Sequence, residues 1–103
     1  MTERTAFVLR VRPDKLDEYV EAHREVWPEL LDALRAAGIR NYTIFRSGNE
    51  MFGYFEADDL EAAGRYLEGQ EVSARWQDRM AEYLEERVPD AGPPPLEQVF
   101  RLE

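Results

Sequence analysis

The sequence contains no cysteine in its 103 residues. A disulfide framework, a thiolate nucleophile and a cysteine-ligated zinc or iron–sulfur site are therefore excluded. Long apolar runs are also missing, because no stretch approaches the roughly 18 apolar residues of a membrane-spanning helix. Residues 1–11 (MTERTAFVLRV) contain an acidic residue and too short an apolar run for a signal peptide. We therefore expect a cytoplasmic protein.

Positive charge is scarce. Asp and Glu together number 22 against 13 Lys and Arg, which gives a formal net charge of −9. A surface this negative repels phosphate backbones and anionic lipid headgroups, so we expect no nucleic-acid partner and no membrane partner. The hydrophobic fraction of 44% is typical of a folded protein. The length indicates a single domain over residues 1–103.

Histidine occurs once, as His23, within a stretch from 12 to 38 where apolar residues recur at helical spacing. The predicted buried stripe consists of Leu16, Tyr19, Val20, His23, Trp27, Leu30, Leu31 and Leu34. Tyr19 precedes His23 by one helical turn, and Trp27 follows it by one turn. The imidazole should therefore face the interior or a pocket, beside two aromatic side chains with polar tips.

Local signals bound this helix. Asp14 is the expected N-cap, directly after Pro13. Pro28 lies inside the periodic run and should kink or restart the helix, because it has no N–H for the carbonyl of Arg24. Gly38 suits the position just after the helix.

The remaining chain alternates between strand and helix signals. Strands are predicted over 5–11, 39–47, 51–57 and 96–102, and the residues SGNE between the second and third form a hairpin turn. A short helix is predicted over 58–69 and a longer one over 71–87, with a break at Gly69 and Gln70 and a proline-rich connector over 88–95. The order βαββαβ, with its second helix broken, predicts an α+β fold of the ferredoxin-like type.

The predicted sheet is apolar on both faces. Helices cover one face of such a sheet, and the other face would normally be polar. Here the alternating residues are apolar on both sides: Ala6 and Val8 against Phe7 and Leu9, Tyr42 and Ile44 against Phe45, and Phe52 and Tyr54 against Met51 and Phe55. We therefore predict a homodimer packed sheet to sheet.

The residues alone leave the role of His23 open, because a lone histidine on an apolar helix face is more often structural than functional. Five motifs together carry more information. They are Tyr19-x3-His23, Trp27-Pro28-Glu29-Leu30, Asn41-Tyr42-Thr43-Ile44-Phe45, Arg75-Trp76 and Gln98-Val99-Phe100. In these motifs the chain resembles the L-rhamnose mutarotase family, from Ala6 to Leu102. The resemblance implies a small cytoplasmic homodimer of the dimeric α/β barrel type that interconverts the α and β anomers of L-rhamnose.

The resemblance also implies the site residues. The family's proton-donating histidine corresponds to His23, and its sugar-contacting tyrosines correspond to Tyr19 and Tyr42. Trp76 matches the first residue of the family's tryptophan pair. Gln77 stands where the family often has a second tryptophan, and it becomes a further candidate for sugar binding.

Mutarotation fits these residue types. One group protonates the ring oxygen of the sugar while another removes the proton of the anomeric hydroxyl, and this requires no cofactor and no metal. A neutral imidazole with a pKa of about 6.5 can give or accept a proton near pH 7. The second proton-transfer group stays open between Tyr19, Tyr42, a carboxylate and an ordered water. The expected substrate is L-rhamnose or a close 6-deoxyhexose.

Other functions remain as alternatives. The first is a haem- or quinone-handling monooxygenase on the same dimeric barrel, in which His23 would bind iron. The second is a sugar-binding dimer without catalytic activity. A metal-dependent isomerase is disfavoured, because the sequence has no His–carboxylate cluster at ligand spacing.

Overall fold

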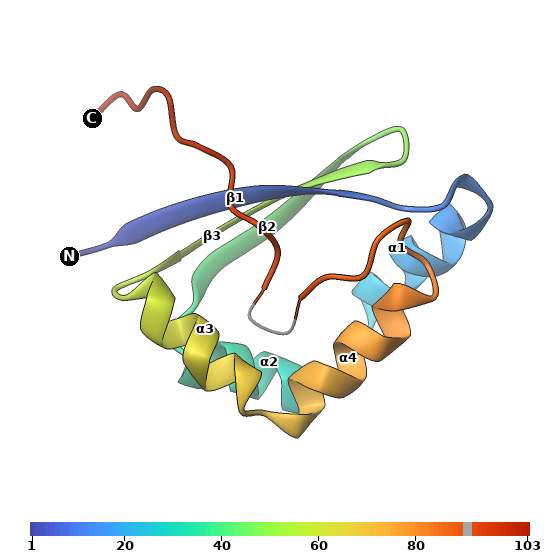
Figure 1. Cartoon of the computed structure of the whole chain (residues 1–103), viewed down its shortest axis with the longest axis horizontal. Coiled ribbons are helices and arrows are strands. Elements are labelled where there is room, and N and C mark those ends of the chain that lie inside the picture. Colours follow the sequence, from blue (N-terminus) through green and yellow to red (C-terminus); the bar gives the residue numbers. More distant parts are fainter. Residues whose placement is uncertain (90–91) are drawn as a thin grey trace.

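The computed structural model describes residues 1–89 and 92–103 and has an α+β architecture. Strands β1 (Glu3–Arg10), β2 (Arg40–Ser47) and β3 (Glu50–Ala57) form an antiparallel sheet in the order β1-β3-β2. Helices α1 (Leu16–Arg24), α2 (Pro28–Ala36), α3 (Leu60–Glu68) and α4 (Glu71–Ala81) all lie on one side of the sheet (Figure 1). The α+β prediction is therefore confirmed. No helix within the described ranges has the length and apolarity needed to cross a bilayer.

Proline divides the first helical stretch as predicted. α1 ends at Arg24, and α2 begins at Pro28. Trp27, directly before the proline, has φ −57° and ψ 132°, which is the extended conformation that a following proline ring requires. Gly38 follows α2 with a φ of +87°, as expected of a glycine just after a helix.

The start of α1 differs from the prediction. Asp14 is not its N-cap, because a 3₁₀ turn over Pro13–Lys15 precedes the helix, and Lys15 occupies the cap position without a side-chain hydrogen bond. The N–H of Lys15 donates to the carbonyl of Arg12 across that turn at 2.8 Å. Asp14 lies inside the turn, so its carboxylate is not placed at the helix end.

The helix predicted over 71–87 is also too long. α4 ends at Ala81, because the backbone that follows pairs with the end of β1 and the residues just after it. The N–H of Arg12 donates to the carbonyl of Tyr83 at 2.8 Å, and the N–H of Glu85 donates to the carbonyl of Arg10 at 2.9 Å. These long-range bonds replace the helical ones. The predicted break at Gly69 and the short helix before it are confirmed.

The sheet face toward the helices carries the core. Phe7 is 2% exposed and lies over Gly53 of the neighbouring strand. A Cβ atom at Gly53 would lie 2.1 Å from Cζ of Phe7, so the ring can occupy this place only because residue 53 is glycine. The larger buried cluster joins the sheet to α1, α2 and α4 and contains Tyr19 and Trp76. Two candidate site residues are thus part of the core.

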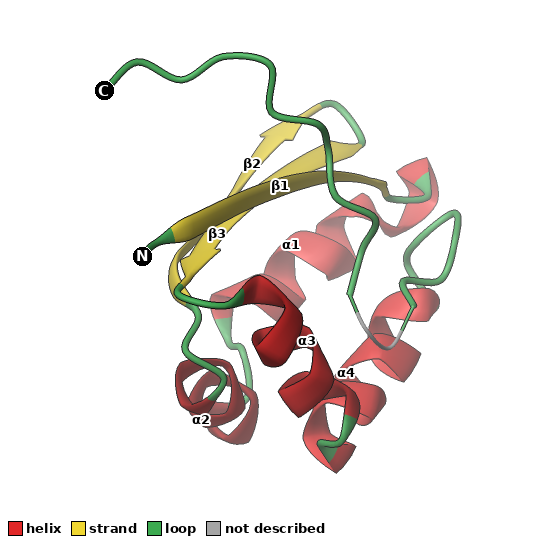
Figure 2. Cartoon of the chain, turned by 60° about the vertical axis from the view of Figure 1, so that its left-hand side comes forward, coloured by secondary structure: helices red, strands yellow, loops and turns green. Residues whose placement is uncertain are grey.

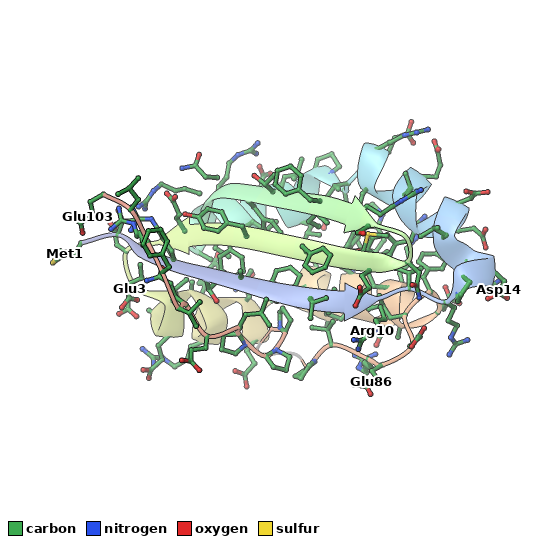
Figure 3. The ribbon with its side chains drawn as sticks, turned by 90° about the horizontal axis from the view of Figure 1, so that it is seen from above. Met1, Glu3, Arg10, Asp14, Glu86 and Glu103 are labelled. Atoms are coloured by element: carbon green, nitrogen blue, oxygen red, sulfur yellow. The ribbon has the colours of Figure 1, made fainter. Side chains whose placement is uncertain are left out.

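The opposite sheet face has no helix over it (Figure 2). Phe45 is 67% exposed, and Phe52, its partner across the β2–β3 ladder, is 40% exposed. Figure 3 looks onto this face and shows aromatic side chains standing out from the strands. Apolar residues therefore do lie on both sides of the sheet, as the strand patterns predicted.

The predicted fourth strand over 96–102 is wrong for this single chain. Within residues 92–103 the backbone forms no strand. Among the described residues, one backbone hydrogen bond ties this segment to the sheet, from the N–H of Leu96 to the carbonyl of Ala6 at 2.7 Å. Beyond that point Val99, Phe100 and Leu102 are 79% to 86% exposed. The segment leaves the helix layer, passes β1 and rises above the uncovered face (Figures 1 and 2). The predicted connector 88–95 includes residues 90 and 91, which lie outside the described residues.

Candidate active site

The five predicted site residues meet at one small cavity of about 40 Å³. α1 supplies Tyr19 and His23, β2 supplies Tyr42, and α4 supplies Trp76 and Gln77. The rest of its described lining is apolar and consists of Phe7, Leu9, Ile44, Met80, Leu84, Val88 and Pro93. The five candidate residues, which lie up to 58 positions apart in the sequence, are therefore brought together at the cavity that His23 lines.

α1 fixes both the position and the tautomer of His23. Nδ1 of His23 lies 2.9 Å from the carbonyl oxygen of Tyr19, one turn earlier. A carbonyl only accepts hydrogen bonds, so Nδ1 carries the proton, and Nε2 of the neutral ring is a proton acceptor. The imidazole also packs against the ring of Tyr19, with centroids 4.3 Å apart. The half-buried ring is thus held by its own helix.

A bulge in β2 helps to place Tyr42. The register of β2 against β3 shifts between Arg40 and Thr43, and Asn41 inside the shift has a φ of +54°. One extra residue in a strand moves the following side chains to the other face. The ring of Tyr42 contacts Phe7 and Phe55 on the helix side of the sheet, at centroid distances of 6.1 and 5.1 Å. Strand alternation alone did not predict this irregularity.

α4 brings an indole against the imidazole. The ring of Trp76 meets His23 edge to face, with centroids 5.4 Å apart and planes at 79°. On another side Trp76 meets Trp27 at 5.1 Å and 86°. Both arrangements are the edge-to-face geometry that aromatic rings favour.

Burial sets the protonation states of the site. It lowers the pKa of His23 from 6.5, while the hydrogen bond to the Tyr19 carbonyl acts in the opposite direction. The imidazole is therefore neutral at pH 7. Burial also raises the pKa of Tyr19 to about 12. Burial and the proximity of Tyr19 raise the pKa of Tyr42 above its usual value. Both phenols therefore stay protonated at pH 7, and each carries an O–H that can donate a hydrogen bond.

A second and larger cavity of about 350 Å³ adjoins the first. The two share four lining residues, which are Tyr42, Trp76, Gln77 and Pro93. Most of the larger lining is apolar: Leu30, Leu34, Ile39, Phe55, Leu60, Ala63 and Leu67. Polar groups enter it from Thr5, Glu61 and Ser73. Sequence reasoning missed Ser73, although its spacing of three and four residues from Trp76 and Gln77 places all three on one face of α4.

Among the described residues, no group of three or more His, Cys, Asp or Glu side chains is placed to hold a metal ion. The lining of the small cavity, as far as the structure describes it, contains no carboxylate. Glu61, the carboxylate of the larger cavity, is paired with Arg65 at 2.5 Å.

Known proteins match both the sequence and the fold. The family model of L-rhamnose mutarotase matches residues 4–102. The chain belongs to the L-rhamnose mutarotase family. An L-rhamnose mutarotase of Pectobacterium atrosepticum is 36% identical over 97% of this chain and 98% of its own length. One from Oceanobacillus iheyensis is 38% identical over 72% of each chain.

A solved structure agrees with this family membership. The crystal structure of an L-rhamnose mutarotase from Formosa agariphila superposes with a TM-score of 0.77 at 33% identity, and the match covers 98% of this chain and 99% of that one. The family resemblance predicted from the motifs is therefore confirmed. It favours an anomer-interconverting isomerase over the haem- or quinone-handling alternative.

Proposed function

We propose that this protein interconverts the α and β anomers of L-rhamnose, or of a close 6-deoxyhexose, without a cofactor. The observation that carries the proposal is the tautomer of His23. Its Nδ1 is occupied by a carbonyl, so Nε2 of the neutral ring accepts a proton at a cavity lined by two protonated tyrosines and an indole. A group of this kind is suited to acid/base catalysis near pH 7.

The two cavities suggest where the sugar lies. The small one, at about 40 Å³, has room for little more than one water-sized group, whereas the larger one, at about 350 Å³, falls in the range of small-molecule sites. We place the pyranose ring in the larger cavity, with its anomeric carbon at the shared wall of Tyr42, Trp76 and Gln77. The apolar lining then accepts the methyl group of the 6-deoxy sugar, and the amide of Gln77 hydrogen-bonds a hydroxyl.

Ring opening and closure follow from this placement. Nε2 of His23 removes the proton from the anomeric hydroxyl while a second donor protonates the ring oxygen, and the bond between the anomeric carbon and the ring oxygen breaks. The open-chain aldehyde turns about its first C–C bond and presents its other face. The hydroxyl that ring opening released then attacks that face of the aldehyde and returns its proton to the donor. The imidazolium of His23 returns its proton to the new anomeric oxygen.

The second proton carrier is a hydroxyl or a water in this scheme. A phenol with a pKa of about 12, such as Tyr19, is too weak an acid to ionise by itself, but it can donate and accept in a concerted relay. Tyr42 lines both cavities and is the better placed of the two tyrosines. A carboxylate is disfavoured, because Glu61 lines the larger cavity and is paired with Arg65.

Saturation-transfer NMR of anomer exchange tests the activity directly. Exchange rates are measured for L-rhamnose, L-fucose and ribose, with and without the protein. We expect greater acceleration for the two 6-deoxyhexoses, L-rhamnose and L-fucose, than for ribose, because ribose lacks the methyl group that the apolar lining accepts. Tight sugar binding with no acceleration would support the alternative of a sugar-binding protein without catalytic activity.

We also propose that the working form is a homodimer, in which a second copy covers the open sheet face. Phe45 and Phe52 stand together on that face, and the C-terminal segment extends above it. Phe45→Glu places a charge in the proposed contact and should convert the dimer to monomer in analytical ultracentrifugation. Tyr66→Glu, at an exposed aromatic residue of α3 on the helix side, is the control and should leave the mass unchanged. A monomeric wild-type protein would refute this arrangement.

A further inference from the structure

Trp27 lies in the connection between α1 and α2, and two features constrain its backbone. Pro28 holds it in an extended conformation, with φ −57° and ψ 132°. Its carbonyl oxygen accepts hydrogen bonds from the N–H groups of Leu30 and Leu31, at 3.0 and 3.1 Å. The direction in which its side chain leaves the backbone is therefore well determined.

The indole of Trp27 is held as well. Cζ of Arg75 lies 5.9 Å from its ring centroid, and Cζ of Arg79 lies 5.8 Å from it, so two cations one turn apart on α4 contact the same ring. Arg75 is itself paired with Glu29 at 3.2 Å and with Glu71 at 3.8 Å. The indole of Trp27 therefore lies at the contact between α2 and α4.

Trp27 lines neither of the two cavities described above. It reaches the site through Trp76, which it meets edge to face at 5.1 Å and 86°. Trp76 in turn meets His23 at 5.4 Å and 79°. The three rings form a row in which the indole of Trp76, a wall of both cavities, is held between the other two.

We infer that Trp27 is a positioning residue, which sets the angle of the Trp76 indole and through it the sugar-stacking surface and the imidazole of His23. This inference rests on the proposed function for its kinetic consequences. If the Trp27 side chain is replaced by a smaller one, the indole of Trp76 loses the ring that packs on its outer side and can rotate away from the cavities. The sugar then loses a stacking surface, and water reaches His23.

Two consequences distinguish this role from a merely structural one. Trp27→Leu should raise KM for L-rhamnose by about fivefold to tenfold, with a smaller change in kcat, because the stacking surface is displaced while the proton-transfer groups remain. Water beside His23 should also raise its pKa toward 6.5, because burial lowers it in the native protein. Tyr19 on α1 and Tyr42 on β2 are the other titratable groups in the described lining around His23.

The composition of the chain allows the signals of His23 and Trp76 to be assigned without ambiguity. His23 is the single histidine, so its imidazole resonances titrate without overlap in NMR. The chain has two tryptophans, so Trp27→Phe and Trp27→Leu leave Trp76 as the single indole N–H signal. We expect Trp27→Phe to keep the ring row, with the titration and KM near wild-type values. Trp27→Leu should shift the Trp76 indole resonance, the His23 titration and KM together.

Leu16→Ala is the control, because Leu16 packs against the same core but lines neither cavity. It should lower the melting temperature without moving KM or the His23 titration. The inference is overturned if Trp27→Leu leaves both at wild-type values, or if Leu16→Ala moves them equally. If the wild-type protein does not accelerate anomer exchange, the proposed function is refuted instead. The His23 titration of the variants would still decide the role of Trp27.

Discussion

Replacing His23 is the most direct test of the proposed chemistry. His23→Ala removes the proton acceptor at the small cavity, and general acid/base catalysis by one positioned group contributes about 100-fold to 10,000-fold. Water can partly take the place of a lost base in this reaction, so we expect kcat for L-rhamnose anomer exchange to fall by about 100-fold to 1,000-fold. KM should change much less than kcat, because Trp27 still packs against the Trp76 indole on its outer side.

The cost in stability can be estimated separately. The substitution deletes the hydrogen bond from Nδ1 to the Tyr19 carbonyl, worth about 1 kcal/mol, and the half-buried ring contacts with Tyr19 and Trp76. We expect a total loss of about 2 kcal/mol, which lowers the melting temperature by roughly 8 to 16 °C in a domain of this size. The variant should therefore remain folded at 25 °C.

Two further variants separate chemistry from structure. His23→Gln can keep the hydrogen bond to the Tyr19 carbonyl but has no titratable proton, so it should be as inactive as His23→Ala and more stable. Glu25→Gln, at an exposed residue after the end of α1, is the control and should match the wild type. Exchange is followed by saturation-transfer NMR and stability by thermal unfolding. A His23→Gln protein that keeps the wild-type kcat would refute the acid/base role of His23.

The remaining predictions concern pH, sugar stacking and packing. Because the pKa of His23 is lowered, kcat/KM should begin to fall only below pH 6.5. The free energy of unfolding should also fall as the pH drops below 6.5, and His23→Gln should remove this part of the pH dependence. The raised pKa of Tyr19 contributes a fall in stability of about 2 to 3 kcal/mol between pH 10 and about 12. Tyr19→Phe should reduce the fall seen in urea unfolding curves by that amount, while the part due to the raised pKa of Tyr42 should persist. Trp76→Phe should raise KM by roughly threefold to tenfold with a smaller change in kcat; an unaltered affinity would remove the indole from the sugar site. Gly53→Ala should cost about 1 to 3 kcal/mol, because its Cβ meets the Phe7 ring, whereas Gly69→Ala, whose Cβ meets an atom at an ordinary 3.6 Å, should be far milder.

Local chemistry made the secondary structure largely predictable. Pro28 divides the first helical stretch, because proline cannot extend the hydrogen bonding of the preceding turn. Gly48 has a φ of +59° in the two-residue hairpin turn, where a positive φ is needed. The helical spacing of Tyr19 and His23 placed their rings side by side on α1, with centroids 4.3 Å apart. Trp27 lies after the end of α1, and its ring and that of His23 each meet Trp76.

Tertiary contacts decided what local signals could not. α4 stops at Ala81 because the backbone after it pairs with the end of β1, and no residue in the predicted helix marks that stop. The segment 96–102 is rich in strand-forming residues but bonds to the sheet at Leu96 alone among the described backbone contacts. A strand needs a neighbour over several residues, and here one chain does not provide it.

The sequence by itself determined most helix and strand types and the two-sided apolar sheet, because each depends on neighbours within a turn or on strand alternation. The candidate site residues came from motifs spread along the whole chain, through their resemblance to the L-rhamnose mutarotase family. Only the tertiary structure decided that Tyr42 and Trp76 share a cavity wall beside His23, that Nδ1 is the occupied nitrogen, and that a large apolar cavity adjoins the small one. Those features depend on how a strand and two helices pack together, and they include the bulge at Asn41 and the contact of Trp27 with Trp76, which joins residues far apart in the chain.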